Sequence, residues 1–165
     1  MRVLRWVGRI LLAVVVLLVG IAGVARFHDG PLGPFPGGPL EDGELVREPG
    51  EDWRFAAEIP EIELQLVDPP RSRTTWVLVR EDQLYVPCAW PESFLKQWPG
   101  QALRDGRVVL RIAGRRYERQ AVRVTDPEVY SELAALGAEK YDYERTAEPD
   151  LEALWFFRMD PRPGG

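Results

Sequence analysis

The stretch that most constrains the fold runs from Arg73 to Trp90, where two apolar runs flank a short charged segment. The first run, 74–79, is rich in β-branched and aromatic residues, which suit a half-buried strand. Four polar residues at 80–83 have the length of a hairpin loop, and a second strand pattern begins at Leu84. Pro87 predicts that this strand ends at a sheet edge or a bulge. Both runs are apolar at nearly every position, which predicts cover on both faces, as in a barrel wall.

Strand signals recur on both sides of this hairpin. Residues 62–67 alternate apolar with mostly polar side chains, which predicts a strand with one buried face. Residues 107–113 and 116–124 predict a second hairpin around a tight turn at Gly114-Arg115. The other expected strands are a weak one at 44–47, a short strand or turn at 53–57, and a last one at 154–159 that Pro161 ends.

Two helical pieces are expected. Asp126 followed by Pro127 is typical of a helix start, and the apolar spacing predicts a helix to about Tyr141. Residues 91–103 predict one or two short helical turns, which Pro99-Gly100 would divide. About six strands in hairpin order with two helical pieces indicate a mainly β (α+β) fold, a small antiparallel barrel preceded by one transmembrane helix.

The transmembrane helix is predicted from residues 10–25, an unbroken apolar run. A bilayer core needs about 20 helical residues, and roughly 17 at the short end. The run reaches that length if it extends to Trp6 and Arg9 snorkels toward the headgroups. Arg2, Arg5 and Arg9 precede the run, so the positive-inside rule predicts a cytoplasmic amino terminus and a domain on the outer (periplasmic or extracellular) side.

A cleaved signal peptide is the alternative interpretation of the same run. Gly23 and Ala25 are small enough for a cleavage site before Arg26, although there is no Ala-x-Ala. The apolar region of a signal peptide is usually about 7–15 residues, so the length favours an uncleaved anchor.

Composition divides the chain into four parts. Residues 1–27 are the anchor or signal peptide, and residues 28–43 are a Gly/Pro-rich linker that cannot form a helix or a central strand. Residues 44–160 form the barrel domain, and residues 161–165 are a tail. The linker carries three apolar residues that could hold it against the domain, namely Leu32, Phe35 and Leu40.

Charge and cysteine content exclude several functions. Residues after position 26 carry 17 basic and 26 acidic side chains, a net charge of −9, which disfavours nucleic acid as a partner. With one histidine (His28) and one cysteine (Cys88), neither a zinc site nor a Cys–His pair has its partners, so no metal is expected. The sequence also lacks glycine-rich phosphate-binding motifs and a Gly-x-Ser-x-Gly motif.

From about Ile62 to Met159 the sequence resembles a known superfamily. The segment TTWVLVREDQLYVPCAW, a short helix with Lys96, the segment RDGRVVLRIAGRRYERQAVRVTDPE and a helix ending AEKY follow the pattern of the FMN-binding split-barrel proteins. That superfamily includes pyridoxamine 5′-phosphate oxidase-like and deazaflavin-dependent nitroreductase-like proteins.

The resemblance implies a six-stranded split barrel, often a homodimer, with FMN or deazaflavin at the subunit interface. Carried over by position, the cofactor-binding candidates are Arg71, Arg73, Thr74 and Lys96, since guanidinium groups and hydroxyls suit phosphate oxygens. This sequence departs from the family pattern in two places. The usual Ser-Arg/Lys-Lys cluster is present only as residues 93–96, and the glycine-rich turn of the deazaflavin branch only as residues 70–73.

Other constellations have simpler interpretations. Six arginines decorate the second hairpin, and an outer sheet face paired with acids is a better interpretation of them than an anion groove: Arg107, Arg111, Arg115, Arg116, Arg119 and Arg123. Four tryptophans could stack on a flavin ring but suit a core better: Trp76, Trp90, Trp98 and Trp155. Cys88 is expected to be a small buried hydrophobe.

Two functions remain open on the sequence. The first is a membrane-anchored, envelope-facing protein that binds a flavin-like or other anionic ligand, with oxidoreductase activity if the cofactor is present. The second is a non-catalytic binding or scaffolding module that kept the barrel and lost the cofactor. The sequence does not decide whether the chain is an enzyme.

Overall fold

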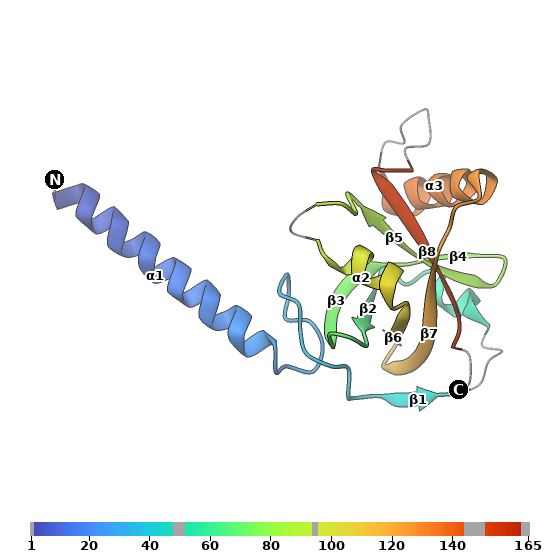
Figure 1. Ribbon diagram of the computed structural model, residues 1–165, viewed down its shortest axis with the longest axis horizontal. Helices are drawn as coiled ribbons and strands as arrows, with labels where there is room; N and C mark the ends of the chain where they lie inside the picture. Colours follow the sequence, from blue (N-terminus) through green and yellow to red (C-terminus); the bar gives the residue numbers. More distant parts are fainter. Residues whose placement is uncertain (1, 48–51, 94–95, 144–150, 163–165) are drawn as a thin grey trace.

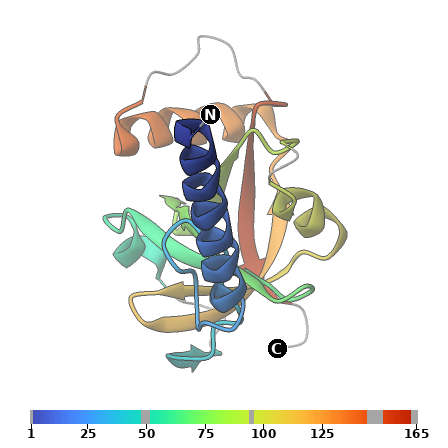
Figure 2. The same ribbon diagram turned by 90° about the vertical axis from the view of Figure 1, so that its left-hand side faces the viewer.

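The computed structural model describes residues 2–47, 52–93, 96–143 and 151–162. Its first element is a single apolar helix, α1 (Arg2–Ala25), that projects from the rest of the molecule as a separate rod (Figures 1 and 2). An 18-residue window within Arg5–Ala25 has a mean hydropathy of 2.6, and none of that window is buried inside the molecule. By length and composition, α1 is able to cross a bilayer, and a signal sequence would meet the same criteria.

The remaining elements build one eight-stranded sheet, two helices and a 3-10 turn. The strands follow the order β3-β2-β6-β7-β8-β5-β4, all antiparallel, and β1 pairs with β7 in parallel. The predicted mainly β (α+β) class is confirmed, with more strands than the expected six. The strands are β1 (Glu44–Val46), β2 (Glu61–Leu66), β3 (Arg71–Trp76), β4 (Leu78–Arg80), β5 (Gln83–Ala89), β6 (Arg107–Ile112), β7 (Arg115–Arg123) and β8 (Leu154–Pro161).

The sheet closes through one bent segment of the chain. Strands β3 and β4 stand at the two ends of the strand order, yet only Val77 separates them in the sequence. The predicted strand 74–79 is therefore two strands with a bend at a fully buried valine. This bend brings the ends of the sheet together and makes it a barrel (Figure 1).

The hairpin predicted between these apolar runs is confirmed with a tighter turn. Arg80 pairs with Gln83, so the loop consists of Glu81 and Asp82 alone. Both have positive φ, 51° and 58°, as a two-residue turn of type I′ requires. Strand β4 covers β5 only from Gln83 to Tyr85, so the edge of β5 away from β8 is open at Pro87, as that proline predicted.

The barrel interior holds the main hydrophobic core. Ile62, Leu64 and Leu66 of β2 point into it, which confirms the predicted buried face of that strand. The second hairpin is also confirmed, with its turn at Ala113-Gly114. Helix α2 (Trp98–Arg104) and the 3-10 turn η1 (Trp53–Ala56) add Trp98 and Trp53 to this core.

Helix α2 corrects one expectation. Pro99-Gly100 does not divide the helical stretch, because Pro99 lies in the first turn of α2, where a missing N–H costs no hydrogen bond. The other predicted contributors, Phe94 and Leu95, lie outside the described residues.

The last helix, α3 (Pro127–Tyr141), packs on the outside of the barrel. Asp126 caps it as predicted, since its Oδ1 accepts the amides of Glu128 at 2.8 Å and Val129 at 3.3 Å. Its buried face meets β4, β5 and β8 in a second apolar cluster, which contains Leu78, Tyr85, Tyr130, Leu133, Ala134 and Phe156.

The Gly/Pro-rich segment after α1 lies against the barrel rather than standing free. Gly37 forms a two-bond bridge with Ser72 of β3, and the Ser72 hydroxyl donates to the Gly38 carbonyl at 2.6 Å. A Cβ at Gly37 would lie 1.8 Å from the Gly30 carbonyl oxygen, so this close approach needs glycine. Of the three apolar residues expected to hold it, Leu40 is buried, Phe35 is partly buried and Leu32 is exposed.

Candidate functional site

The register of β3 decides which predicted ligand residues can act together. Arg73 is opposite Leu64 and Arg71 is opposite Leu66, and both leucines point into the core. Directly opposed residues share a face of the sheet, so both arginines lie on the inner face of β3. Thr74 is opposite Glu63, on the outer face, and is exposed. Arg73 and Thr74 therefore point to opposite sides of the strand.

Arg73 is a cation placed largely inside the barrel. Its guanidinium lies 5.6 Å from the centre of the Trp98 ring, and its Nε is buried without a hydrogen-bond partner. Burial lowers the pKa of Arg73 to about 10. Within the part of the chain that the structure describes, no carboxylate pairs with it. Such a group is destabilising unless something else neutralises it.

Lys96 lies at the end of β5, although it is far from Arg73 in the sequence. Its ammonium donates to the Ala89 carbonyl at 2.7 Å, which holds it at the end of β5. Burial raises the pKa of the Cys88 thiol to about 11, while the charges of Lys96 and Arg73 act in the opposite direction. Both cations thus act on one thiol, and Cys88 is 3% exposed, as expected for a small buried hydrophobe.

Trp90 adds an exposed ring to this end of the barrel. It follows the last residue of β5, has a φ of 47°, and is 72% exposed. Left-handed φ values at residues other than glycine are often found at functional positions. Its amide donates to the Ala153 carbonyl at 2.6 Å, so its backbone is fixed while its ring faces solvent. We call Arg73, Cys88, Trp90, Lys96 and Trp98 the β5-end site.

The structure leaves two predicted ligands outside the β5-end site. Thr74 faces outward, and Arg71 lies next to Arg26 at the start of β3, where burial and the Arg26 charge lower the pKa of Arg71. Of the other tryptophans, Trp155 is core, while Trp76 is 42% exposed and stacks on Tyr141 with ring centres 4.2 Å apart. The sequence did not show that Trp90 is more exposed than the other barrel tryptophans. Side-chain periodicity does not reveal that a residue with positive φ follows the end of β5.

The arginines of the second hairpin are largely satisfied within the barrel. Arg107 pairs with Asp105, and Arg116 donates to the carbonyls of Gly43 and Leu40. The expectation of a single outer face is wrong for Arg119, which is 4% exposed and lies over the Trp53 ring at 4.9 Å. Arg123 also lies over a ring, that of Trp155, at 3.9 Å.

Two surface depressions lie away from the β5-end site. One of about 600 Å³ is lined by Arg80, Arg123 and Arg158 beside Glu81, Asp126 and Asp160, so its charges balance. The other, of about 390 Å³, includes Lys140, whose ammonium donates to the carbonyls of Ile59 and Val77. Neither includes a residue that the sequence singled out as a ligand. In the described part of the chain, no group of three or more metal-ligating side chains is present.

No protein-family model matches the chain, and no curated protein matches it in sequence. Among solved structures, a candidate pyridoxamine 5′-phosphate oxidase from Listeria innocua is 15% identical with a TM-score of 0.45, covering 61% of this chain and 82% of its own. A NimC/NimA family protein from Clostridium acetobutylicum is 14% identical with a TM-score of 0.45, covering 62% and 74%. An F420 reductase is 16% identical with a TM-score of 0.45, covering 68% and 95%. At this level of similarity, function has to be inferred from the residues of this chain.

Proposed function

We propose that this chain is a membrane-anchored protein of the cell envelope whose barrel binds a phosphate-bearing, flavin-like ligand at the β5-end site. The observation that supports this most directly is Arg73, a largely buried guanidinium with no carboxylate partner among the described residues. A ligand phosphate would supply the missing negative charge and accept charge-assisted hydrogen bonds. Arg2, Arg5 and Arg9, which precede the apolar run 10–25, favour an outward-facing barrel.

The residues of the β5-end site fit an FMN or a deazaflavin by their chemistry. Arg73 and Lys96 would hold the phosphate, and the exposed ring of Trp90 could stack on the flat ring system. A bound flavin or deazaflavin would supply hydride transfer, and the chain would then be an oxidoreductase. Pairing of two barrels at this end, as a homodimer, would shield the ligand from water.

Titration of the detergent-solubilised full chain with FMN, and separately with a deazaflavin, followed by ligand fluorescence, tests this proposal. We expect saturable binding, weakened at least about tenfold by Arg73→Met or Lys96→Met, because each change removes one charge-assisted interaction. Arg54→Met is the matched control, since Arg54 is exposed and already paired with Asp52. Absence of saturable binding of both FMN and deazaflavin would refute the ligand assignment.

A non-catalytic scaffold is the second candidate, and one observation favours it. The Lys96 ammonium is already bound to the Ala89 carbonyl, and Thr74 faces away from Arg73. Under this alternative, Trp98 alone compensates Arg73 through a cation–π contact. Arg73→Met and Lys96→Met would then leave every binding property unchanged.

A further inference from the structure

We propose that Arg26 and Arg71 together bind the phosphate of a bilayer lipid at the level where α1 leaves the membrane. The site is distinct from the β5-end site and involves the segment that joins α1 to the barrel. It rests on the membrane anchoring proposed above, but not on a flavin-like ligand.

Backbone contacts hold these two arginines at the same corner of the barrel. Arg26 directly follows Ala25, the last residue of α1. Its carbonyl oxygen lies 2.6 Å from where a Cβ would stand on Gly38, and the Gly38 carbonyl accepts the Ser72 hydroxyl at 2.6 Å. Arg71 is the residue before Ser72 and begins β3. The end of the apolar helix is thereby fixed against the start of a barrel strand.

The corner carries two positive charges, and the charge of Arg26 acts on Arg71. In the described part of the chain, no carboxylate pairs with either arginine. The Arg26 charge is close enough to act on Arg71, which is itself half-buried. Like charges repel each other, and an anion bound by both guanidinium groups would replace that repulsion with attraction.

The position of the corner identifies the anion as a lipid phosphate. The residue after an apolar membrane helix lies at the depth of the headgroups, where phosphates are concentrated. Phe27, next to Arg26, is 90% exposed, and an aromatic ring at this depth suits the membrane interface. The rest of the chain after residue 26 is acidic, with 26 acids, so it would not attract anions generally.

Native mass spectrometry of the detergent-solubilised full chain, with phosphatidylglycerol added stepwise, tests the proposal. We expect one retained lipid per chain and at least about a tenfold loss of apparent affinity in Arg26→Gln/Arg71→Gln. Arg104→Gln is the matched control, because Arg104 is exposed like Arg26 but belongs to α2 rather than to α1 or β3. Diacylglycerol has the acyl chains without the phosphate. The wild type should retain no more of it than the double variant does.

Three outcomes would overturn this inference. Equal lipid retention by the double variant and Arg104→Gln would show that the corner is not the site. Retention of diacylglycerol as strong as that of phosphatidylglycerol would show that the phosphate is not recognised. Displacement of the lipid by millimolar inorganic phosphate, with the same arginine dependence, would identify a free anion as the ligand.

Alkaline extraction of native membranes separates these failures from a failure of anchoring, because an anchored chain stays in the pellet.

Discussion

Burial in the barrel interior controls the protonation of the Cys88 thiol. Cys88 lies in the core beside two cations, yet burial outweighs them and its pKa is raised from 9.0 to about 11. A raised pKa means that the folded state holds the thiol proton more tightly than the unfolded chain does. The resulting stability is fully present below about pH 9 and is lost as the pH rises to about 11. A reactive thiolate at neutral pH is excluded by the same argument.

This shift predicts a specific alkaline destabilisation. Two pKa units correspond to about 3 kcal/mol of unfolding free energy, most of which is lost by about pH 11. In Cys88→Ala this titration is absent, so its unfolding free energy should fall less between about pH 8 and pH 11 than that of the wild type. Urea unfolding at the two pH values measures both proteins, and all other titrating groups cancel in the comparison. An equal alkaline loss in the two proteins would contradict the assignment to Cys88.

At the scale of elements, the start of α3 depends on one side chain. Asp126 accepts two backbone amides of the first turn, and Pro127 follows it without an N–H to satisfy. Asp126→Ala leaves both amides without that partner and should cost about 1 kcal/mol of unfolding free energy. Asp126→Asn retains the acceptor and should cost only a few tenths of a kcal/mol. Thermal unfolding of both variants tests this ordering, and equal losses would show that charge rather than capping matters.

The sequence predicted helices and strands well where residues close together in the chain determine them. The Asp126-Pro127 start, the alternation at Ile62, Leu64 and Leu66, and the open edge at Pro87 all follow from backbone hydrogen bonding and side-chain period. The two-residue turn at Glu81-Asp82 was predicted as a longer loop, because neither residue is the glycine or asparagine that usually marks positive φ. The bend at Val77 carries no local signal, since barrel closure imposes it.

At the scale of the whole molecule, contacts between distant segments decide which arginines can act as ligands. Arg71 and Arg73 are two residues apart and share a face, yet one lies beside Arg26 and the other beside Trp98. Lys96 and Arg73 are far apart in the sequence, and the fold makes both of them act electrostatically on Cys88 of β5. The sequence predicted these residues by position in a resemblance, but it contained no information on which neighbours each would meet.

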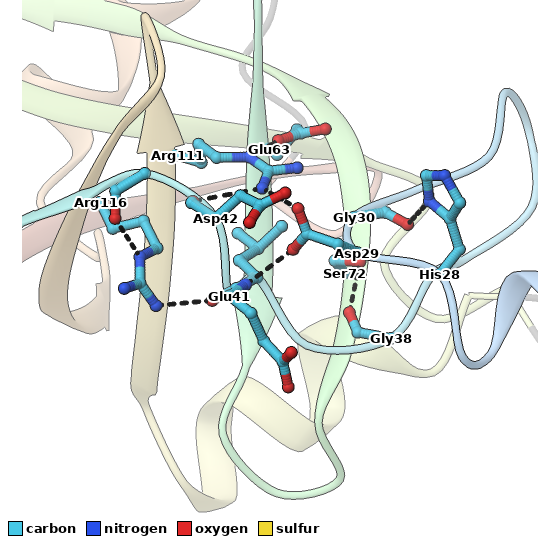
Figure 3. Close-up of polar contacts among 12 residues, drawn as sticks. His28, Asp29, Gly30, Gly38, Glu41, Asp42, Glu63, Ser72, Arg111 and Arg116 are labelled. Atoms are coloured by element: carbon cyan, nitrogen blue, oxygen red, sulfur yellow. Dashed lines mark hydrogen bonds and ion pairs between the residues drawn. The ribbon is translucent and has the colours of Figure 1, made fainter.

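Arg111 of β6 joins the segment after α1 to the barrel by an ion pair (Figure 3). Its guanidinium donates to Asp29 at 2.6 Å and also pairs with Glu63 on the adjacent strand. Partial burial opposes the shift, but the Glu41 amide and Arg111 lower the pKa of Asp29 below its usual value. Asp29 therefore remains ionised well into the acid range, and the contact should persist there.

Removing Arg111 should release this segment while the barrel stays folded. In Arg111→Met, Asp29 and Glu63 lose their common partner, and we expect a cost of about 1–3 kcal/mol that falls mainly on the segment. Hydrogen exchange measures the opening of this segment. The probes are the amides of Gly37 and Ser72, each of which donates to the other residue's carbonyl, at 2.9 and 3.3 Å. These amides should exchange at least about tenfold faster, since about 1.4 kcal/mol changes an opening equilibrium tenfold.

Arg107→Met is the matched control, because Arg107 is on the same strand but pairs with Asp105 at the surface. Unchanged exchange at Gly37 in Arg111→Met would mean that the Gly37–Ser72 bridge holds the segment by itself.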